Sequence, residues 1–245
     1  HAQAAALPLT TITAYESFFK RLGIDRDGGD AGQSVLIIGG AGGVGSIAIQ
    51  LAAHHFGLTV IATAGRETSA NWCQAMGAHQ VVDYRKELLP QLELLGHPQV
   101  DGILVTQSLD EYWHSACQAV APFGGICAIV DARAPLDLNP LKPKSARFCW
   151  EFMFTRAMFA ATMQRQGDIL ARLVTGGLDG RHDHPDPRRH PRRTGRAIHL
   201  RRYQGRPDGR LTALVPRPRL HRKAEAIISG SLTFGDFMSI SQEAR

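Results

Sequence analysis

Short runs of hydrophobic residues alternate along the chain with longer segments whose apolar positions recur every three or four residues. The short runs predict buried strands, and the longer segments predict helices, two of which end at Gly57 and Gly77. The predicted strands cover residues 34–39, 58–64, 79–84, 100–106, 125–131 and 146–156, and the predicted helices cover 44–57, 69–77, 86–96, 110–124 and 157–174.

Strands that alternate with helices predict an α/β fold with a doubly wound parallel sheet. Right-handed crossovers and two βαβαβ halves give such a Rossmann sheet the strand order 3-2-1-4-5-6. We expect this domain to span residues 33–178. Residues 1–32 are predicted to be a helical lead-in with Pro8 near its first turn, followed by a polar, glycine-rich loop. The first residue is His1 rather than methionine, which indicates a start inside a longer protein.

The composition is typical of a soluble globular protein, with 44% hydrophobic residues among 245. No window of about 18 apolar residues could span a membrane, and the start, HAQAAALPL, lacks the features of a signal peptide. The four cysteines, Cys73, Cys117, Cys127 and Cys149, form no Cys-x-x-Cys pair. Free thiols, most of them buried, fit a reducing compartment, so the sequence predicts a cytoplasmic protein.

The net charge of +6 is unevenly distributed. Residues 179–223 hold 14 of the 28 Lys+Arg and only 4 of the 22 Asp+Glu, a net of +10, which leaves the rest mildly acidic. Six prolines and the lack of apolar periodicity predict an irregular basic segment there, before a tail at 224–245.

Two interpretations of this basic segment remain open. Arginine-rich stretches bind nucleic-acid phosphates non-specifically, but only Tyr203 offers a ring for stacking, so we do not expect nucleic acid as the main partner. The bias toward Arg, Pro, His and Gly is also typical of a GC-rich gene read in the wrong frame. Resequencing the coding DNA tests that hypothesis.

The stretch GAGGVG, at residues 40–45, fits the pattern G-x-G-x-x-G between a predicted strand and a predicted helix. In this context the first glycine permits a tight turn, the second lets the backbone approach a pyrophosphate, and the third lets the helix pack against the strand. The N–H groups near Gly43 and Val44 then face anionic oxygens at the positive end of the helix dipole. A glycine turn without a ligand is the alternative.

The end of the second strand bears on the choice between NADH and NADPH. An NADH site places Asp or Glu there to accept a hydrogen bond from the ribose 2′-OH, whereas this chain reads TAGR, from Thr63 to Arg66. The Arg66 guanidinium can bind a 2′-phosphate with two hydrogen bonds, a charge-assisted contact worth roughly 1.5–3 kcal/mol. Glu67 keeps NADH as an alternative, because a shift of one residue in the turn presents a carboxylate instead. The sequence favours NADPH.

Four segments, AAALPLTTITAYESFF (4–19), VLIIGGAGGVGSIAIQLA (35–52), GAHQVVDYRKE (77–87) and NPLKPKSARFCWEFMFTR (139–156), carry a family resemblance. Together they resemble the medium-chain dehydrogenase/reductase superfamily, in its zinc-type alcohol dehydrogenase-like and quinone oxidoreductase-like branch. The resemblance covers about residues 3–175. It implies reduction of a quinone or an activated carbonyl or enone by NAD(P)H. It also implies a preceding GroES-like substrate domain, so that this chain would be the cofactor-binding fragment.

The resemblance implies roles for residues at the ends of the predicted strands. It places the pyrophosphate on the glycine turn, the adenosine ribose beside Arg66 and Tyr84, and the nicotinamide beside Thr106 and residues 129–131. Hydride transfer needs no nucleophile from the protein, and the sequence assigns no catalytic residue or proton donor. The candidate cofactor-binding residues are Gly40, Gly42, Gly43, Val44, Gly45, Thr63, Arg66, Tyr84, Thr106, Ile129 and Asp131.

The chain departs from the family pattern in two places. The basic segment stands where the family has a helix and a strand that return to the substrate domain. The sequence also has no zinc-binding set, and His182 and His184 are predicted to be surface histidines, so we expect no bound zinc.

The predicted sixth strand has two distinct faces, since four aromatic residues between 148 and 154 alternate with other residues. One interpretation is core packing. The resemblance implies the other, an edge strand around Phe148–Thr155 that pairs with a second copy in a homodimer.

Two functions from different classes remain. The first is an NADPH-dependent oxidoreductase acting on a small-molecule substrate, for which we expect cofactor binding but little or no turnover in this chain without the substrate domain. The second is a nucleotide-binding module without activity, either a fragment or a redox sensor. A short-chain reductase is excluded, because no tyrosine of the chain is followed by lysine four residues later.

Overall fold

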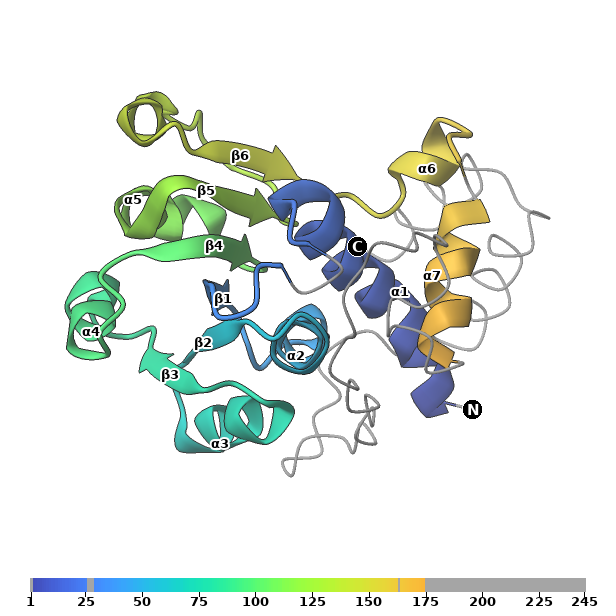
Figure 1. The fold of residues 1–245 in the computed structure, drawn as a ribbon, viewed down its shortest axis with the longest axis horizontal. Coiled ribbons are helices and arrows are strands. Elements are labelled where there is room, and N and C mark those ends of the chain that lie inside the picture. The colour runs from blue at the N-terminus through green and yellow to red at the C-terminus, as the bar shows by residue number, and fades with distance from the viewer. Residues whose placement is uncertain (1, 26–28, 163, 175–245) are drawn as a thin grey trace.

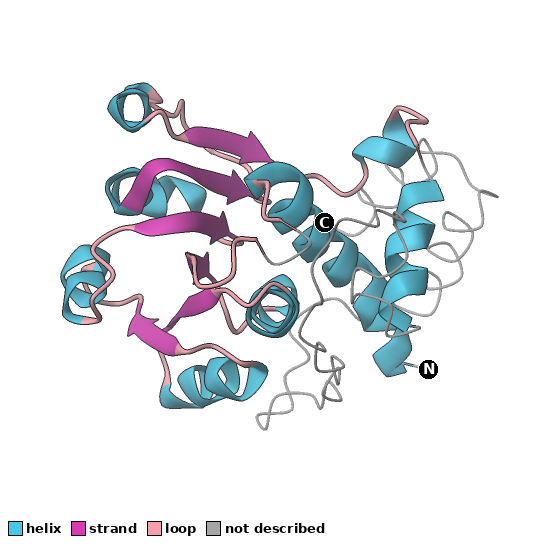
Figure 2. Cartoon of the chain, in the orientation of Figure 1, coloured by secondary structure: helices cyan, strands magenta, loops and turns pink. Residues whose placement is uncertain are grey.

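The computed structural model describes residues 2–25, 29–162 and 164–174. A parallel sheet in the order β3-β2-β1-β4-β5-β6 forms its centre, with helices on both faces (Figures 1 and 2). This confirms the predicted Rossmann sheet and its strand order. The strands are β1 (Ser34–Ile38), β2 (Thr59–Ala64), β3 (Gln80–Asp83), β4 (Val100–Val105), β5 (Val120–Ala128) and β6 (Arg147–Trp150).

Helices connect these strands and precede the first of them. The α-helices are α1 (Ala2–Glu16), α2 (Gly43–Gln50), α3 (Glu67–Met76), α4 (Leu88–Leu94), α5 (Leu109–Ala119), α6 (Thr155–Met158) and α7 (Gln164–Val174). Two π-helical turns, η1 (Ser17–Leu22) and η2 (Leu51–His55), continue α1 and α2, and a 3-10 helix, η3 (Asn139–Lys144), precedes β6.

The sheet separates two hydrophobic cores, which explains why its strands are continuous apolar runs. In β1, Val35 and Ile37 face the core formed with α1, α2 and α3, whereas Leu36 and Ile38 face the core formed with α4 and α5. All four side chains are buried, as expected for a central strand of a parallel sheet.

The segment before β1 packs into the first of these cores. Tyr15 of α1 and Phe18 and Leu22 of η1 are buried there. Pro8 lies in the middle of α1, not near the first turn as predicted, because the alanine-rich start is a strong helix former and carries the helix N-terminal to the proline. The left-handed backbone of Gly23, with φ of 72°, ends the helical segment.

The predicted end of the helix over residues 110–124 was wrong. The sequence predicted a helix to residue 124, but α5 ends at Ala119 and β5 begins at Val120. The Lys144 ammonium group donates to the carbonyl oxygens of residues 117, 118 and 120 at 2.6–3.0 Å, which satisfies the end of α5. Ala121 also precedes Pro122, and a residue before proline disfavours the helical conformation.

The predicted strand 146–156 was too long, since β6 ends at Trp150. Beyond it, the Glu151 amide still donates to the Ala128 carbonyl of β5 and its buried side chain pairs with Arg21, but the Thr155 amide then donates to the Phe152 carbonyl in a turn. The predicted helix 157–174 is likewise divided into α6 and α7. β6 lies at the edge of the sheet, and the pairing of this edge in a homodimer, with a segment reduced to residues 148–150, stays a prediction.

Candidate functional site

Two threonine hydroxyl groups from the neighbouring strands make hydrogen bonds to the turn between β1 and α2. The Gly39 amide donates to Thr63 Oγ1 of β2 at 3.0 Å, and Thr106 Oγ1, just after β4, donates to the Ile38 carbonyl at 2.8 Å. The Gly42 amide donates back to the Gly39 carbonyl at 3.0 Å. Thr63 and Thr106, both predicted to bind the cofactor, therefore brace the glycine turn in this structure.

The glycines of the turn fall into two groups by what a side chain there would meet. A Cβ at Gly45 would lie 2.3 Å from the Gly39 carbonyl oxygen, and a Cβ at Gly40 would lie 2.8 Å from the Cβ of Ala62. Gly42 and Gly43 are exposed instead, and a Cβ on either would meet its nearest neighbour at 3.2 Å or more. The first pair lets α2 pack onto β1, and the second pair leaves backbone open to a ligand, as a pyrophosphate turn requires.

The first amides of α2 have no acceptor within the helix. The Ser46 amide donates to the Gly42 carbonyl at 2.9 Å, so the amides of Gly43, Val44 and Gly45 precede the first bonded turn. The Ser46 hydroxyl donates to the same carbonyl at 2.7 Å and accepts a hydrogen bond from Trp72 Nε1 at 2.8 Å. These contacts fix a helix start that fits an anionic group such as a pyrophosphate.

The register between β2 and β3 brings together two predicted site residues. Ala64 pairs with Asp83, so Gly65 and Arg66 lie beside Tyr84 at the same edge of the sheet. The Tyr84 ring covers Gly65 closely, since a Cβ at Gly65 would lie 2.4 Å from Tyr84 Cζ. Arg66 is exposed before the first residue of α3 and has no ion-pair partner in the described ranges.

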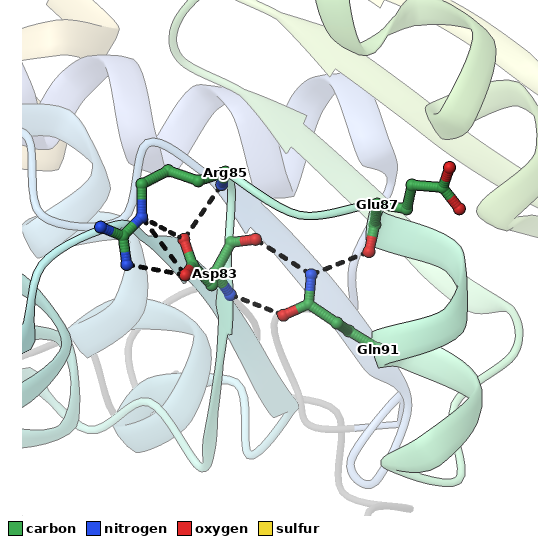
Figure 3. A network of polar contacts seen from close by, with 4 residues as sticks. All are labelled: Asp83, Arg85, Glu87 and Gln91. Carbon is green, nitrogen blue, oxygen red and sulfur yellow. Dashed lines mark hydrogen bonds and ion pairs between the residues drawn. The ribbon is translucent and has the colours of Figure 1, made fainter.

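An ion pair flanks this corner (Figure 3). Arg85 donates from Nε and Nη2 to both carboxylate oxygens of Asp83 at 2.8–3.3 Å, and its backbone amide adds a bond of 3.0 Å to Oδ1. These hydrogen bonds lower the pKa of Asp83 to about 2. The Gln91 amide exchanges two hydrogen bonds with the Asp83 backbone and donates to the Glu87 carbonyl, which ties the end of β3 to α4.

The predicted nicotinamide side lies at the same carboxyl edge. Thr106 follows β4, Ile129 follows β5, and the Ile129 amide donates to the Val105 carbonyl at 3.1 Å. Asp131 lies two residues beyond Ile129 and is exposed. α1 passes close to the glycine turn, where a Cβ on Gly43 would lie 3.4 Å from Thr10 Cγ2.

Two ion pairs fasten α1 and η1 to the segment after β6. Glu16 accepts from Arg156 at 2.6 Å, and Glu151 accepts from Arg21 at 2.7 Å. Burial raises the pKa of Glu151, although the Arg21 guanidinium opposes that shift. Its second oxygen, Oε1, is buried without a hydrogen-bond partner among the residues that the structure describes.

The described residues contain no group of three His, Cys, Asp or Glu placed to hold a metal ion, so they do not fit a zinc centre. The cysteines are free, as predicted, and burial raises the pKa of Cys117 to about 11 and that of Cys127 to about 12. His182 and His184 lie outside the described residues. Within those residues no helix has the length and apolar character needed to cross a membrane.

Gly39 and the Asp83–Arg85 pair were not predicted from the sequence. Gly39 adopts φ of 84°, and a Cβ there would lie 2.3 Å from Thr106 Oγ1. The sequence did indicate a special backbone position, since Gly39 and Gly40 form a doublet at the end of the first predicted strand. The G-x-G-x-x-G pattern begins only at Gly40, so it does not include Gly39. The register that places Asp83 beside Ala64 is a property of two paired strands, and the sequence of either strand alone does not indicate it.

The sequence matches the zinc-binding dehydrogenase family over residues 43–166. A zinc-type alcohol dehydrogenase-like protein of Staphylococcus aureus is 46% identical over 155 residues, which cover 63% of this chain and 46% of that protein. A chloroplastic NADPH-dependent alkenal/one oxidoreductase of Arabidopsis thaliana is 41% identical over 91 residues, 37% of this chain and 22% of that protein.

The fold is similar to a crystal structure from Rhizobium etli of a protein proposed to be a zinc-dependent alcohol dehydrogenase. The TM-score is 0.66 at 41% sequence identity, with 72% of this chain and 53% of that chain covered. The chain thus spans about half the length of the Staphylococcus aureus protein and of this structure.

Proposed function

Because the chain belongs to the zinc-binding dehydrogenase family, we propose that it binds NADPH and forms the cofactor side of an oxidoreductase. The proposed reaction transfers hydride to a quinone or an activated carbonyl or enone. The observation that carries the proposal is the open backbone of Gly42 and Gly43 at the start of α2. The name of the Arabidopsis thaliana relative, an NADPH-dependent alkenal/one oxidoreductase, supports both the cofactor and the acceptor class.

Each part of the edge has a proposed role in binding. The amides of Gly43 and Val44 bind the pyrophosphate, Arg66 binds the 2′-phosphate, and Tyr84 packs beside the adenosine. Thr106 and residues 129–131 border the nicotinamide at the ends of β4 and β5. When bound, NADPH supplies the hydride.

The oxidoreductase and a nucleotide-binding module without activity are separated by NADPH consumption with a naphthoquinone. We expect turnover in the full product of the natural gene, and NADPH binding with little turnover in the chain as given. The rate without protein and the rate without quinone are the controls. Saturable binding without turnover in both proteins would favour the module.

A further inference from the structure

The adenosine ribose is proposed to bind beside the end of β2. β2 has no carboxylate there, but the neighbouring strand β3 supplies one. β2 ends at Ala64, where an NADH site would have Asp or Glu. The register pairs Ala64 with Asp83 on β3, and neighbouring strands lie about 4.8 Å apart. Residues in register on parallel strands present their side chains to the same face of the sheet. Asp83 therefore brings an acidic group within one strand spacing of the position that selects the cofactor.

This carboxylate is not available as a free charge. Arg85 donates to both of its oxygens from the side chain and to one of them from the backbone. The Asp83 side chain is 23% exposed, whereas the Arg85 side chain is 64% exposed. The guanidinium thus covers the carboxylate, and the contacts of Gln91 with the Asp83 backbone hold the end of β3 in place (Figure 3).

The surroundings make the charge of this pair relevant to a phosphate. Tyr84, between Asp83 and Arg85 in the chain, covers Gly65, and Arg66 follows Gly65. A negative charge here opposes a 2′-phosphate and accepts a hydrogen bond from a 2′-hydroxyl. Neutralising Asp83 therefore favours the phosphate.

We propose that Arg85 is a specificity-determining residue, which lets the site accept a 2′-phosphate by neutralising Asp83. This inference rests on the proposed binding of a nicotinamide dinucleotide at the same edge. It assigns Arg85 a role distinct from that of Arg66, since Arg66 contacts the phosphate and Arg85 acts through the carboxylate. In this proposal, the Asp83 carboxylate favours NADH when Arg85 does not neutralise it.

The test compares dissociation constants for NADPH and NADH, from fluorescence titration, in four variants. Arg85→Ala exposes the carboxylate, and we expect the preference for NADPH over NADH to fall about tenfold. The double variant Asp83→Asn with Arg85→Ala removes both charges and should restore most of the wild-type preference. Asp83→Asn should keep the preference. Lys86→Ala, which removes an exposed positive charge next in the chain, should change it less than threefold.

The outcomes separate this inference from the proposed function. A wild-type chain that binds neither nucleotide would contradict the proposed function itself. If the wild type prefers NADPH but Arg85→Ala keeps that preference, the inference is overturned. It is also overturned if the double variant shows the same loss as Arg85→Ala, because Arg85 then acts on the phosphate by its own charge. Arg85 is exposed, so its truncation removes no core contact.

Discussion

Gly43 and Gly45 lie two residues apart in the first turn of α2, and they meet different surroundings. A Cβ on Gly45 would press on the Gly39 carbonyl oxygen at 2.3 Å, whereas a Cβ on Gly43 would meet only Thr10 Cγ2, at 3.4 Å. The sequence pattern predicts both glycines but gives no distinction between them. Their difference depends on how closely α2 approaches β1, which is a property of the packed structure.

This difference predicts unequal effects of two alanine substitutions. Both gain about 1 kcal/mol of helix propensity. Gly45→Ala should still lower the free energy of unfolding by about 2 kcal/mol, because overpacking against backbone outweighs that gain. Gly43→Ala should stay within about 1 kcal/mol of the wild type. Urea unfolding checks both, and equal losses in the two variants would contradict the packing described for Gly45.

Among the other site residues, the sequence located the edge but not every role. Tyr84 covers Gly65, the residue before Arg66, because β2 and β3 are neighbours, and the roles of Arg66 and Tyr84 in cofactor binding stay predictions. Thr63 and Thr106 brace the turn through hydrogen bonds that no spacing in the sequence indicates. The Asp83–Arg85 pair was not predicted, because Asp83 lies beside Ala64 only through the register of β2 and β3.

At the scale of elements, the hydrophobic pattern predicted where the strands and helices lie, but it did not predict where α5 and β6 end. α5 ends where Lys144, far along the chain, binds its last carbonyl groups. Just after β6, the Glu151 amide still donates to the Ala128 carbonyl of β5, its side chain pairs with Arg21, 130 residues earlier in the sequence, and a turn follows at residues 152–155. Such long-range pairs leave no periodicity in the residues around them. The turn at residues 152–155 likewise leaves the alternation of aromatic residues unchanged, so the period of two predicted a strand that continued past Trp150.

The Glu151 pair predicts a pH dependence of stability. Because its folded pKa is raised above its ordinary value near 4.5, the folded state holds the proton more tightly than the unfolded chain does. Its contribution to stability is therefore fully present below that value and is lost as the pH rises through the folded pKa. Glu151→Gln should lack this slope, so its stability relative to the wild type should improve as the pH rises.

Urea unfolding of wild type and Glu151→Gln from about pH 4 to 8 measures that difference. Asp83→Asn is the control that should differ from the wild type by a constant amount over this range, because the pKa of Asp83 is lowered from its ordinary value of 3.8 to about 2. Its contribution is present above 3.8 and is lost as the pH falls through about 2. A stability difference for Glu151→Gln that is constant with pH would contradict the assignment.

At the scale of the whole molecule, one edge of one sheet collects the candidate site. The order β3-β2-β1-β4-β5-β6 brings the ends of β1 to β5 to that edge, although their residues are spread from Gly40 to Asp131. In a parallel, doubly wound sheet such an edge is where ligands bind. The fold order was predictable because helical crossovers are right-handed. In the proposed function, a few side chains at the ends of β2 and β3 determine which nucleotide binds there.

Titration of the chain with NADPH and NADH, in wild type and Arg66→Ala, tests the proposed site most directly. We predict saturable binding of NADPH, tighter than that of NADH. Arg66→Ala should weaken NADPH binding about 10- to 100-fold and leave NADH unchanged. Arg165→Ala, an exposed arginine of α7, is the matched control and should bind like the wild type. Tighter binding of NADH than of NADPH, or no saturable binding of either, would contradict the account.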